Sequence, residues 1–286
     1  MAKRVSLIRR LKQQTMRSGL GQVIGASWGR VLTPERWLFI IGCYNSGTTL
    51  LKDLLAEHPR IGTLAGEGVK FSDALPRPED FGWQRMWCQC VDQVRLNPED
   101  RERADRIKRQ WSMLYPTRPV LLEKSIANTV HIPFLKTHFK PAHFIYIVRN
   151  GYVVAEGIRR KAEPGKRGNP VYSGAYPIGL CARQWADTDR MVEREREGLS
   201  HFMSLRYEEF VADPDVHLRR ITDFIGLDPL DKRLLDQDWN VHGVESTIRN
   251  MNGPSLARLS DADRADVLDA AGDVLERWGY GPEDSA

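Results

Sequence analysis

The segment from residue 37 to residue 58 constrains the fold of this chain more than any other. Residues 37–41 form a short apolar, partly β-branched run, which ends at a loop that begins with Gly42 and closes with Gly47. From Thr48 to His58, leucines recur at helical spacing. The pattern predicts a buried strand, a tight loop and a helix. In that arrangement, backbone N–H groups and the positive end of the helix dipole can bind an anion.

Further short apolar runs follow along the chain, separated by segments of helical spacing. The expected additional strands are residues 61–64, 120–122, 144–148 and 202–206, with later helices at about 215–225 and 261–278. Continuous apolar runs separated by helices indicate a parallel sheet that is buried on both faces. We therefore expect an α/β fold: a P-loop-like parallel β-sheet flanked by helices, in a single domain with helical insertions.

Two segments stand apart from this pattern. Residues 70–118, rich in proline, tryptophan and charge, are expected to form a helical insertion that covers a site, with helices near 86–94 and 101–114. Residues 1–36 hold eight Lys or Arg against Glu35 alone, whereas the remainder holds 34 basic and 37 acidic residues. This basic N-terminal extension fits a solvated helix, a transit segment or a peripheral contact with an anionic membrane. The segment lacks the alternation of arginine and aromatic residues that would indicate nucleic acid binding.

Cysteine usage and hydropathy favour a soluble, cytoplasmic protein. Four cysteines in 286 residues are too few for a disulfide framework, which favours a reducing compartment. The longest apolar run near the start, residues 37–41, is far shorter than the roughly 20 residues that span a bilayer.

Polar residues gather where the predicted strands end. They are residues 46–49, Glu67, residues 123–125, Arg149 and Tyr207. Because ligands bind beyond the carboxyl ends of strands in open parallel sheets, these residues are expected to surround one site. The loop at residues 42–49 resembles a phosphate-binding loop but lacks the Gly-Lys-Ser/Thr ending of the ATP type, so we expect a ligand other than a triphosphate. The alternative is a glycine turn with Thr48 as a helix cap.

Several motifs occur in the order found in sulfotransferases that use 3'-phosphoadenosine-5'-phosphosulfate (PAPS). They are Ser-Gly-Thr-Thr at 46–49, His-Pro at 58–59, Glu-Lys-Ser at 123–125, Ile-Val-Arg-Asn-Gly at 147–151, Arg-Tyr-Glu-Glu at 206–209 and Phe-Ile-Gly-Leu at 224–227. Over about residues 36–281, and most weakly between 70 and 118, the chain resembles this family, and within it the branch of tyrosylprotein and carbohydrate sulfotransferases.

The resemblance implies a residue set that binds PAPS and its product adenosine 3',5'-bisphosphate, without a metal. The 5'-phosphosulfate would lie on Ser46, Gly47, Thr48 and Thr49, preceded by Asn45. Arg149 would grip the 3'-phosphate, as a guanidinium can bind two oxygens at once. Tyr207 would lie near the nucleotide, and Arg258 would reach the 3'-phosphate from a cofactor-covering loop at residues 240–260. The alternatives are that Arg149 forms an ordinary salt bridge, that Tyr207 belongs to the core, and that residues 240–260 form a polar surface loop.

The resemblance also implies catalytic roles. Glu67 would act as the base that takes the proton of the acceptor, with a modestly raised pKa. Lys124 would neutralise the leaving oxygen, and Ser246 would help to hold the transferring group. Glu123 would orient Lys124 or serve as a second candidate base. The alternative for Glu67 is an ion pair with an arginine, and the alternative for Glu123 is an ion pair at the end of its strand.

Two positions depart from the family pattern. Asn45 stands where a Lys or Arg commonly precedes Ser-Gly-Thr-Thr, so charge must come from Lys124 or another basic segment. Gly157 stands where a serine usually contacts the 3'-phosphate, and Arg159, Arg160 or Lys161 are candidates to replace that contact. Residues 159–167 are expected to form a mobile basic loop.

The expected function is transfer of a sulfuryl group from PAPS to a hydroxyl acceptor, which is a small molecule, a sugar or a peptide tyrosine. Two other hypotheses remain. One is a nucleotide kinase of related fold, which the missing loop lysine disfavours. The other is a protein that binds the nucleotide without catalysis, which Asn45 and Gly157 would permit.

Overall fold

The core of the protein is a parallel five-stranded sheet with helices on both faces. The computed structural model describes residues 7–241 and 243–281. The strand order is β2-β3-β1-β4-β5, and a separate antiparallel pair joins β6 to β7. The strands are β1 (Arg36–Gly42), β2 (Ile61–Thr63), β3 (Val120–Glu123), β4 (Ala142–Val148), β5 (Phe202–Arg206), β6 (Trp239–Val241) and β7 (Val244–Ser246). The predicted P-loop-like α/β fold is confirmed.

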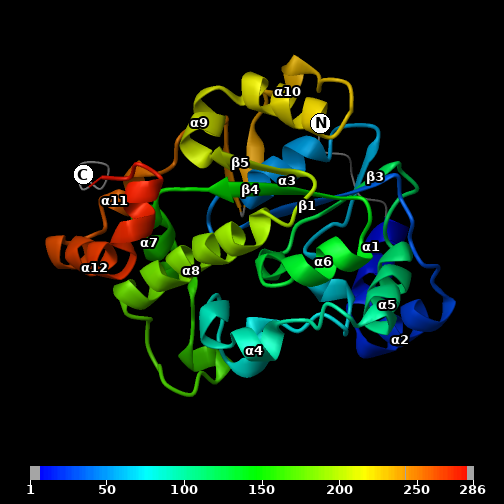
Figure 1. Ribbon diagram of the computed structural model, residues 1–286, viewed down its shortest axis with the longest axis horizontal. Helices are drawn as coiled ribbons and strands as arrows, with labels where there is room; N and C mark the ends of the chain where they lie inside the picture. Colours follow the sequence, from blue (N-terminus) through cyan, green and yellow to red (C-terminus); the bar gives the residue numbers. More distant parts are fainter. Residues whose placement is uncertain (1–6, 242, 282–286) are drawn as a thin grey trace.

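Helices α3, α9 and α10 lie on one face of the sheet, and α6 and α8 lie on the other (Figure 1). The helices are α1 (Leu7–Met16), α2 (Gly19–Trp28), α3 (Thr48–Leu55), α4 (Val91–Val94), α5 (Arg101–Ser112), α6 (Ile132–His138), α7 (Gly151–Lys161), α8 (Ile178–Arg196), α9 (Tyr207–Ala212), α10 (Pro214–Phe224), α11 (Gly253–Leu256) and α12 (Asp261–Arg277). Six short 3-10 turns complete the described elements: η1 (Gly68–Phe71), η2 (Pro78–Phe81), η3 (Trp87–Gln89), η4 (Ile126–Thr129), η5 (Gly165–Arg167) and η6 (Lys232–Leu234). None of the helices within the described ranges is both long enough and apolar enough to cross a bilayer.

Strand β1 contributes to two hydrophobic cores because successive side chains point to opposite faces of the sheet. Trp37, Phe39 and Ile41 pack with side chains of α5, α6 and α8, whereas Leu38 and Ile40 pack with α3, α9 and α10. All five side chains are almost fully buried. Each contributes about 1.5–3 kcal/mol of burial free energy, so the apolar run that predicted this strand also fixes it at the centre of the sheet.

The observed elements differ from the expected ones at several ends. Helix α3 stops at Leu55 instead of His58, because Pro59 cannot continue it and the N–H groups of residues 57 and 58 turn back to carbonyls only three residues away. The expected helix near 86–94 is divided into η3 and α4 at Cys90, whose backbone (φ −143°, ψ 35°) is not helical.

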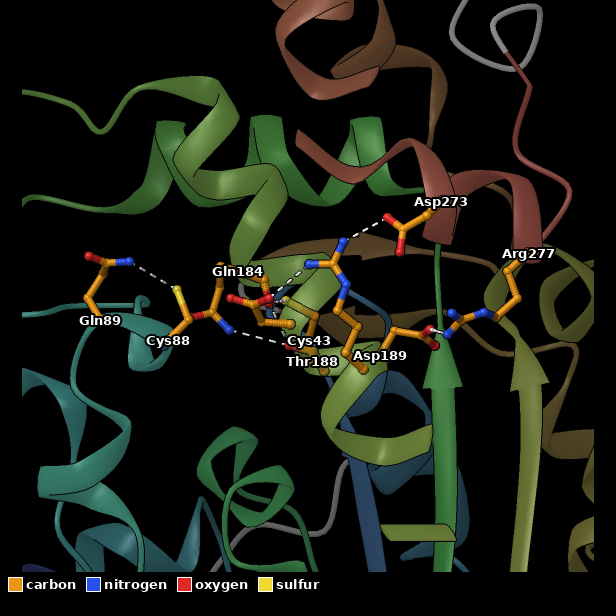
Figure 2. A network of polar contacts seen from close by, with 10 residues as sticks. Cys43, Cys88, Gln89, Gln184, Thr188, Asp189, Asp273 and Arg277 are labelled. Carbon is orange, nitrogen blue, oxygen red and sulfur yellow. Dashed lines mark hydrogen bonds and ion pairs between the residues drawn. The ribbon is translucent and has the colours of Figure 1, made fainter. Parts of the chain in front are cut away.

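A network of polar contacts ties α8 to the loop that follows β1 and to α12 (Figure 2). The Gln184 carbonyl accepts a contact from the Cys43 Sγ at 3.9 Å, and the Gln184 side chain accepts the Cys88 backbone N–H at 2.9 Å. Five residues further along α8, buried Asp189 accepts from Arg277 at 2.6 Å. Helix α8 therefore supports the start of the loop on which the candidate site is built.

Candidate active site

The loop after β1 bends tightly in front of α3. Asn45 has φ 64° and Gly47 has φ 90°, both in the left-handed region, which asparagine and glycine tolerate best. A Cβ at Gly47 would lie 2.6 Å from Tyr207 Cδ2, so only glycine fits beside that ring. Ser46 is fully buried, and its Oγ has no hydrogen-bond partner among the described residues. A buried hydroxyl without a partner at the start of a helix suits an anion.

A pocket of about 460 Å³ opens beside this loop. Eight of the eleven predicted site residues line it: Asn45, Gly47, Thr48, Thr49, Arg149, Tyr207, Ser246 and Arg258. Residues separated by more than two hundred positions therefore share one cavity, and residues 246–258 form one of its walls. Ser46 lies buried next to the lining, whereas Glu67 and Lys124 are not among the lining residues.

Arg149 joins the two sides of this pocket. Its Nη1 donates to the Asn45 carbonyl at 2.8 Å, its Nε donates to Asn252 Oδ1 at 2.8 Å, and its guanidinium lies 4.1 Å from the centre of the Tyr207 ring. Burial lowers the pKa of Arg149, although the charges of Tyr207 and Glu208 act in the opposite direction. The arginine is fixed against the loop by hydrogen bonds to neutral oxygens, which leaves its charge available to an anion.

Glu208, which was not among the predicted site residues, supports Arg149 through Asn252. Glu208 accepts hydrogen bonds from the Asn252 amide at 2.8 Å, the Asn150 backbone N–H at 3.0 Å and the Tyr280 hydroxyl at 2.8 Å. Asn252 in turn holds Arg149. The only sequence signal for this role was that Glu208 follows Tyr207 at the end of β5.

Glu67 and Lys124 form an ion pair at the end of the neighbouring strand β3. The Lys124 Nζ lies 2.7 Å from Glu67 Oε1, with side-chain exposures of 8% and 28%. Burial raises the pKa of Glu67, but Lys124, Lys70 and Arg85 outweigh burial and the net pKa is lowered. The expectation of a raised pKa for Glu67 is therefore wrong, because its cationic partner lies 57 residues away in the sequence.

Glu123 holds the Glu67 segment in place. It is almost fully buried and accepts from the Gly68 backbone N–H at 2.7 Å, from Ser125 Oγ at 2.6 Å and from Asn128. Burial raises its pKa. With these contacts, Glu123 is a positioning residue for the segment that carries Glu67 and is not accessible to an acceptor.

Comparison with known proteins identifies the family. A family model described as "Sulfotransferase family" matches residues 38–232, which is more than half of the chain. The chain belongs to the sulfotransferase family. It is 24% identical to a protein-tyrosine sulfotransferase A of Caenorhabditis elegans, over 86% of this chain and 67% of that protein. It is 23% identical to an omega-hydroxy-beta-dihydromenaquinone-9 sulfotransferase of Mycobacterium bovis, over 90% of this chain and 79% of that protein.

Solved sulfotransferases share the fold. A sulfotransferase from Mycobacterium avium matches with a TM-score of 0.54 and 15% identity, over 95% of this chain and 86% of that chain. The sulfotransferase domain from the curacin biosynthetic pathway matches with a TM-score of 0.52 and 17% identity, over 85% of this chain and 97% of that chain. The expected sulfotransferase assignment is confirmed, and it favours this enzyme class over the kinase alternative.

In this sulfotransferase, helix α7 reaches further than expected. Residues 159–161 belong to α7, so the expected mobile basic loop is wrong for these three positions. Val153, Gly157, Arg160 and Lys161 all line the pocket. Val153, Gly157 and Lys161 follow Arg149 at intervals of four residues, and this helical spacing was the signal that could have placed them on one face.

Proposed function

We propose that this sulfotransferase transfers a sulfuryl group from PAPS to a hydroxyl acceptor and releases adenosine 3',5'-bisphosphate. The observation that carries the proposal is the contact of Arg149 with the Asn45 carbonyl at 2.8 Å. This contact supports a single pocket in which the loop and an arginine address two anionic ends of one molecule. A pocket of about 460 Å³ has the size of a small-molecule site.

Three features support the proposed binding of the donor. The buried Ser46 Oγ lacks a partner among the described residues, and Gly47, Thr48 and Thr49 line the pocket at the start of α3, where a helix end favours an anion. Arg149 would hold the 3'-phosphate, with the Tyr207 ring against its guanidinium. Ser246 and Arg258 would cover the donor from the 240–260 segment, since both line the pocket.

The proposed reaction forms a bond between the acceptor oxygen and sulfur and breaks the bond between sulfur and the oxygen of the 5'-phosphate. Glu67 would take the proton of the acceptor, and its lowered pKa keeps the carboxylate ionised near neutral pH. Lys124 would move from Glu67 toward the leaving oxygen and neutralise the charge that builds there.

The acceptor is proposed as a hydroxyl compound. The two relatives are named for different acceptors, a protein tyrosine in one and an omega-hydroxy dihydromenaquinone in the other. Both named acceptors carry a hydroxyl group. The proposal is therefore limited to hydroxyl compounds, which include small molecules, sugars and peptide tyrosines.

Transfer of radiolabelled sulfate from PAPS to a panel of phenols, sugars, lipid alcohols and tyrosine peptides tests this function. We expect labelled product with at least one acceptor class. In parallel, adenosine 3',5'-bisphosphate without metal should raise the melting temperature, because a ligand that binds only the folded state stabilises it. Stabilisation by ATP with magnesium alone would support the kinase alternative. Binding without transfer to any acceptor would support the non-catalytic alternative.

We also propose a peripheral membrane contact for the basic N-terminal extension. Helix α2 presents Leu20, Val23, Ile24 and Trp28 to solvent, and Leu20 and Trp28 are 73% and 84% exposed. Exposed apolar side chains in a segment with eight basic residues and one acidic residue match a negatively charged lipid surface.

Vesicle co-sedimentation tests the membrane proposal. We expect the chain to sediment with vesicles that contain phosphatidylserine and not with neutral phosphatidylcholine vesicles. The double substitution Leu20→Ser and Trp28→Ser should lower the bound fraction several-fold. Equal sedimentation of the double variant, or a dimer in solution that the variant abolishes, would contradict the proposal.

A further inference from the structure

Three basic residues end helix α7, and only one of them lacks an acidic partner. Arg159 forms an ion pair with Asp263, with two contacts at 2.5 and 3.1 Å. Arg160 forms an ion pair with Glu156 at 2.8 Å. In residues 7–241 and 243–281, Lys161 has no carboxylate partner, and its Nζ donates to Asn45 Oδ1 at 3.0 Å. Lys161 lines the pocket, so its charge is directed to the site.

The surroundings of Lys161 are mostly positive. Burial is the largest influence, and Arg85, Arg160 and Arg149 act in the same direction, so that the pKa of Lys161 falls to about 8. Glu156 on the same helix is the opposing negative charge, and it is already paired with Arg160. A partly buried ammonium among guanidinium groups is unfavourable unless an anion enters. The pocket therefore favours a ligand with negative charge next to Asn45.

Gly157 makes the contact between Asn45 and Lys161 possible. A Cβ at residue 157 would lie 2.8 Å from Asn45 Nδ2 and 3.0 Å from its Cγ. A larger residue at position 157 would push the Asn45 side chain away from Lys161. The two departures from the family pattern, Asn45 and Gly157, therefore belong together: glycine provides the space, asparagine fills it, and its amide oxygen orients the lysine.

We propose that Lys161 binds the 5'-phosphosulfate of the donor and supplies the positive charge that Asn45 does not carry. The proposal rests on the function proposed above and assigns the charge to a different element, since the lysine comes from α7 and not from the loop. Asn45 directly precedes the loop residues, and both Asn45 Nδ2 and Ser46 Oγ lack partners within the described part of the chain. An anionic oxygen between Lys161, Asn45 and Ser46 would provide a partner for each of these groups.

Calorimetric titration of the full chain with adenosine 3',5'-bisphosphate and with adenosine 5'-monophosphate tests the assignment. Lys161→Gln should weaken both ligands by about tenfold or more, because it removes a charge-assisted hydrogen bond to the 5' end. Lys161→Arg keeps the charge and should retain most of the affinity. Lys166→Gln is the matched control: it removes the same charge from an exposed side chain nearby and should leave both affinities unchanged.

The pH dependence gives a second measurement. Protonated Lys161 binds the anion, so the affinity of the native chain for the bisphosphate should fall by about tenfold between pH 7 and pH 9. The Lys161→Gln variant should lose most of this dependence.

Four outcomes would overturn the assignment. Unchanged affinity in Lys161→Gln, or an equal pH dependence in both proteins, would show that Lys161 does not contact the ligand. Weakening of the bisphosphate alone would move Lys161 to the 3' end. If the native chain binds neither nucleotide, the proposed function fails as well, which distinguishes that result from failure of the lysine assignment alone.

Discussion

Replacement of Lys124 by alanine is expected to lower the turnover of sulfuryl transfer by about 10²- to 10³-fold, with little change in the affinity for adenosine 3',5'-bisphosphate. The side chain is 8% exposed and 2.7 Å from Glu67, at the end of the strand next to β1. Its charge is needed most when the leaving oxygen becomes negative, so its loss affects the transition state more than the bound nucleotide. Radiolabelled transfer under saturating PAPS measures the effect.

The same variant should also change the pH profile. Lys124 holds the pKa of Glu67 down against the effect of burial, so that pKa rises when the lysine is removed. In the profile of residual activity against pH, the acid limb is then expected to move to higher pH. The reason is that Glu67 becomes protonated at a higher pH than in the native chain. A rate equal to that of the native chain, or an unchanged acid limb, would count against the assigned roles. Lys166→Ala, which removes an exposed amine paired with Glu163 and away from Glu67, serves as the control.

Replacement of Arg149 by alanine is expected to weaken the binding of adenosine 3',5'-bisphosphate by about 30-fold or more, which corresponds to ~2 kcal/mol. Arg149 is oriented by Asn252 and the Asn45 carbonyl, so its position is fixed before the ligand arrives. The loss should be specific for the 3'-phosphate. Calorimetry with adenosine 5'-monophosphate provides the control, because that ligand lacks the 3' group and its affinity should change much less.

An equal loss for both ligands would instead indicate that Arg149 acts through the loop. Its hydrogen bond to Asn45 makes such an effect measurable, since an alanine would release that carbonyl. Unchanged affinity for the bisphosphate would contradict the assignment of Arg149 altogether.

The fold was predictable because a local pattern carried it. The apolar run before the loop fills both cores, and strands buried on both faces need few other signals. The ends of helices were less predictable. Residues 159–161 looked like a loop by charge and by the following proline, yet α7 includes them because Arg159 is paired with Asp263, more than a hundred residues away.

The candidate site was predictable in part for a related reason. Residues that follow parallel strands meet at one edge of the sheet whatever their separation in sequence, and this placed Thr48, Arg149 and Tyr207 together. The pKa and the charge pairing of a side chain depend on neighbours that are distant in the sequence and cannot be identified from it. The lowered pKa of Glu67 depends on Lys124, and the charge that Lys161 brings to the pocket depends on which of its neighbours are already paired.

The proposed function requires that one pocket recognises both phosphate ends of an adenosine nucleotide. Titration of the native chain with adenosine 3',5'-bisphosphate, adenosine 5'-monophosphate and adenosine 3'-monophosphate tests it most directly. We predict that the bisphosphate binds at least about tenfold more tightly than either monophosphate, since only it engages the loop and Arg149 together. Equal affinity of the bisphosphate and one monophosphate, or no binding of any of the three, would contradict the claim.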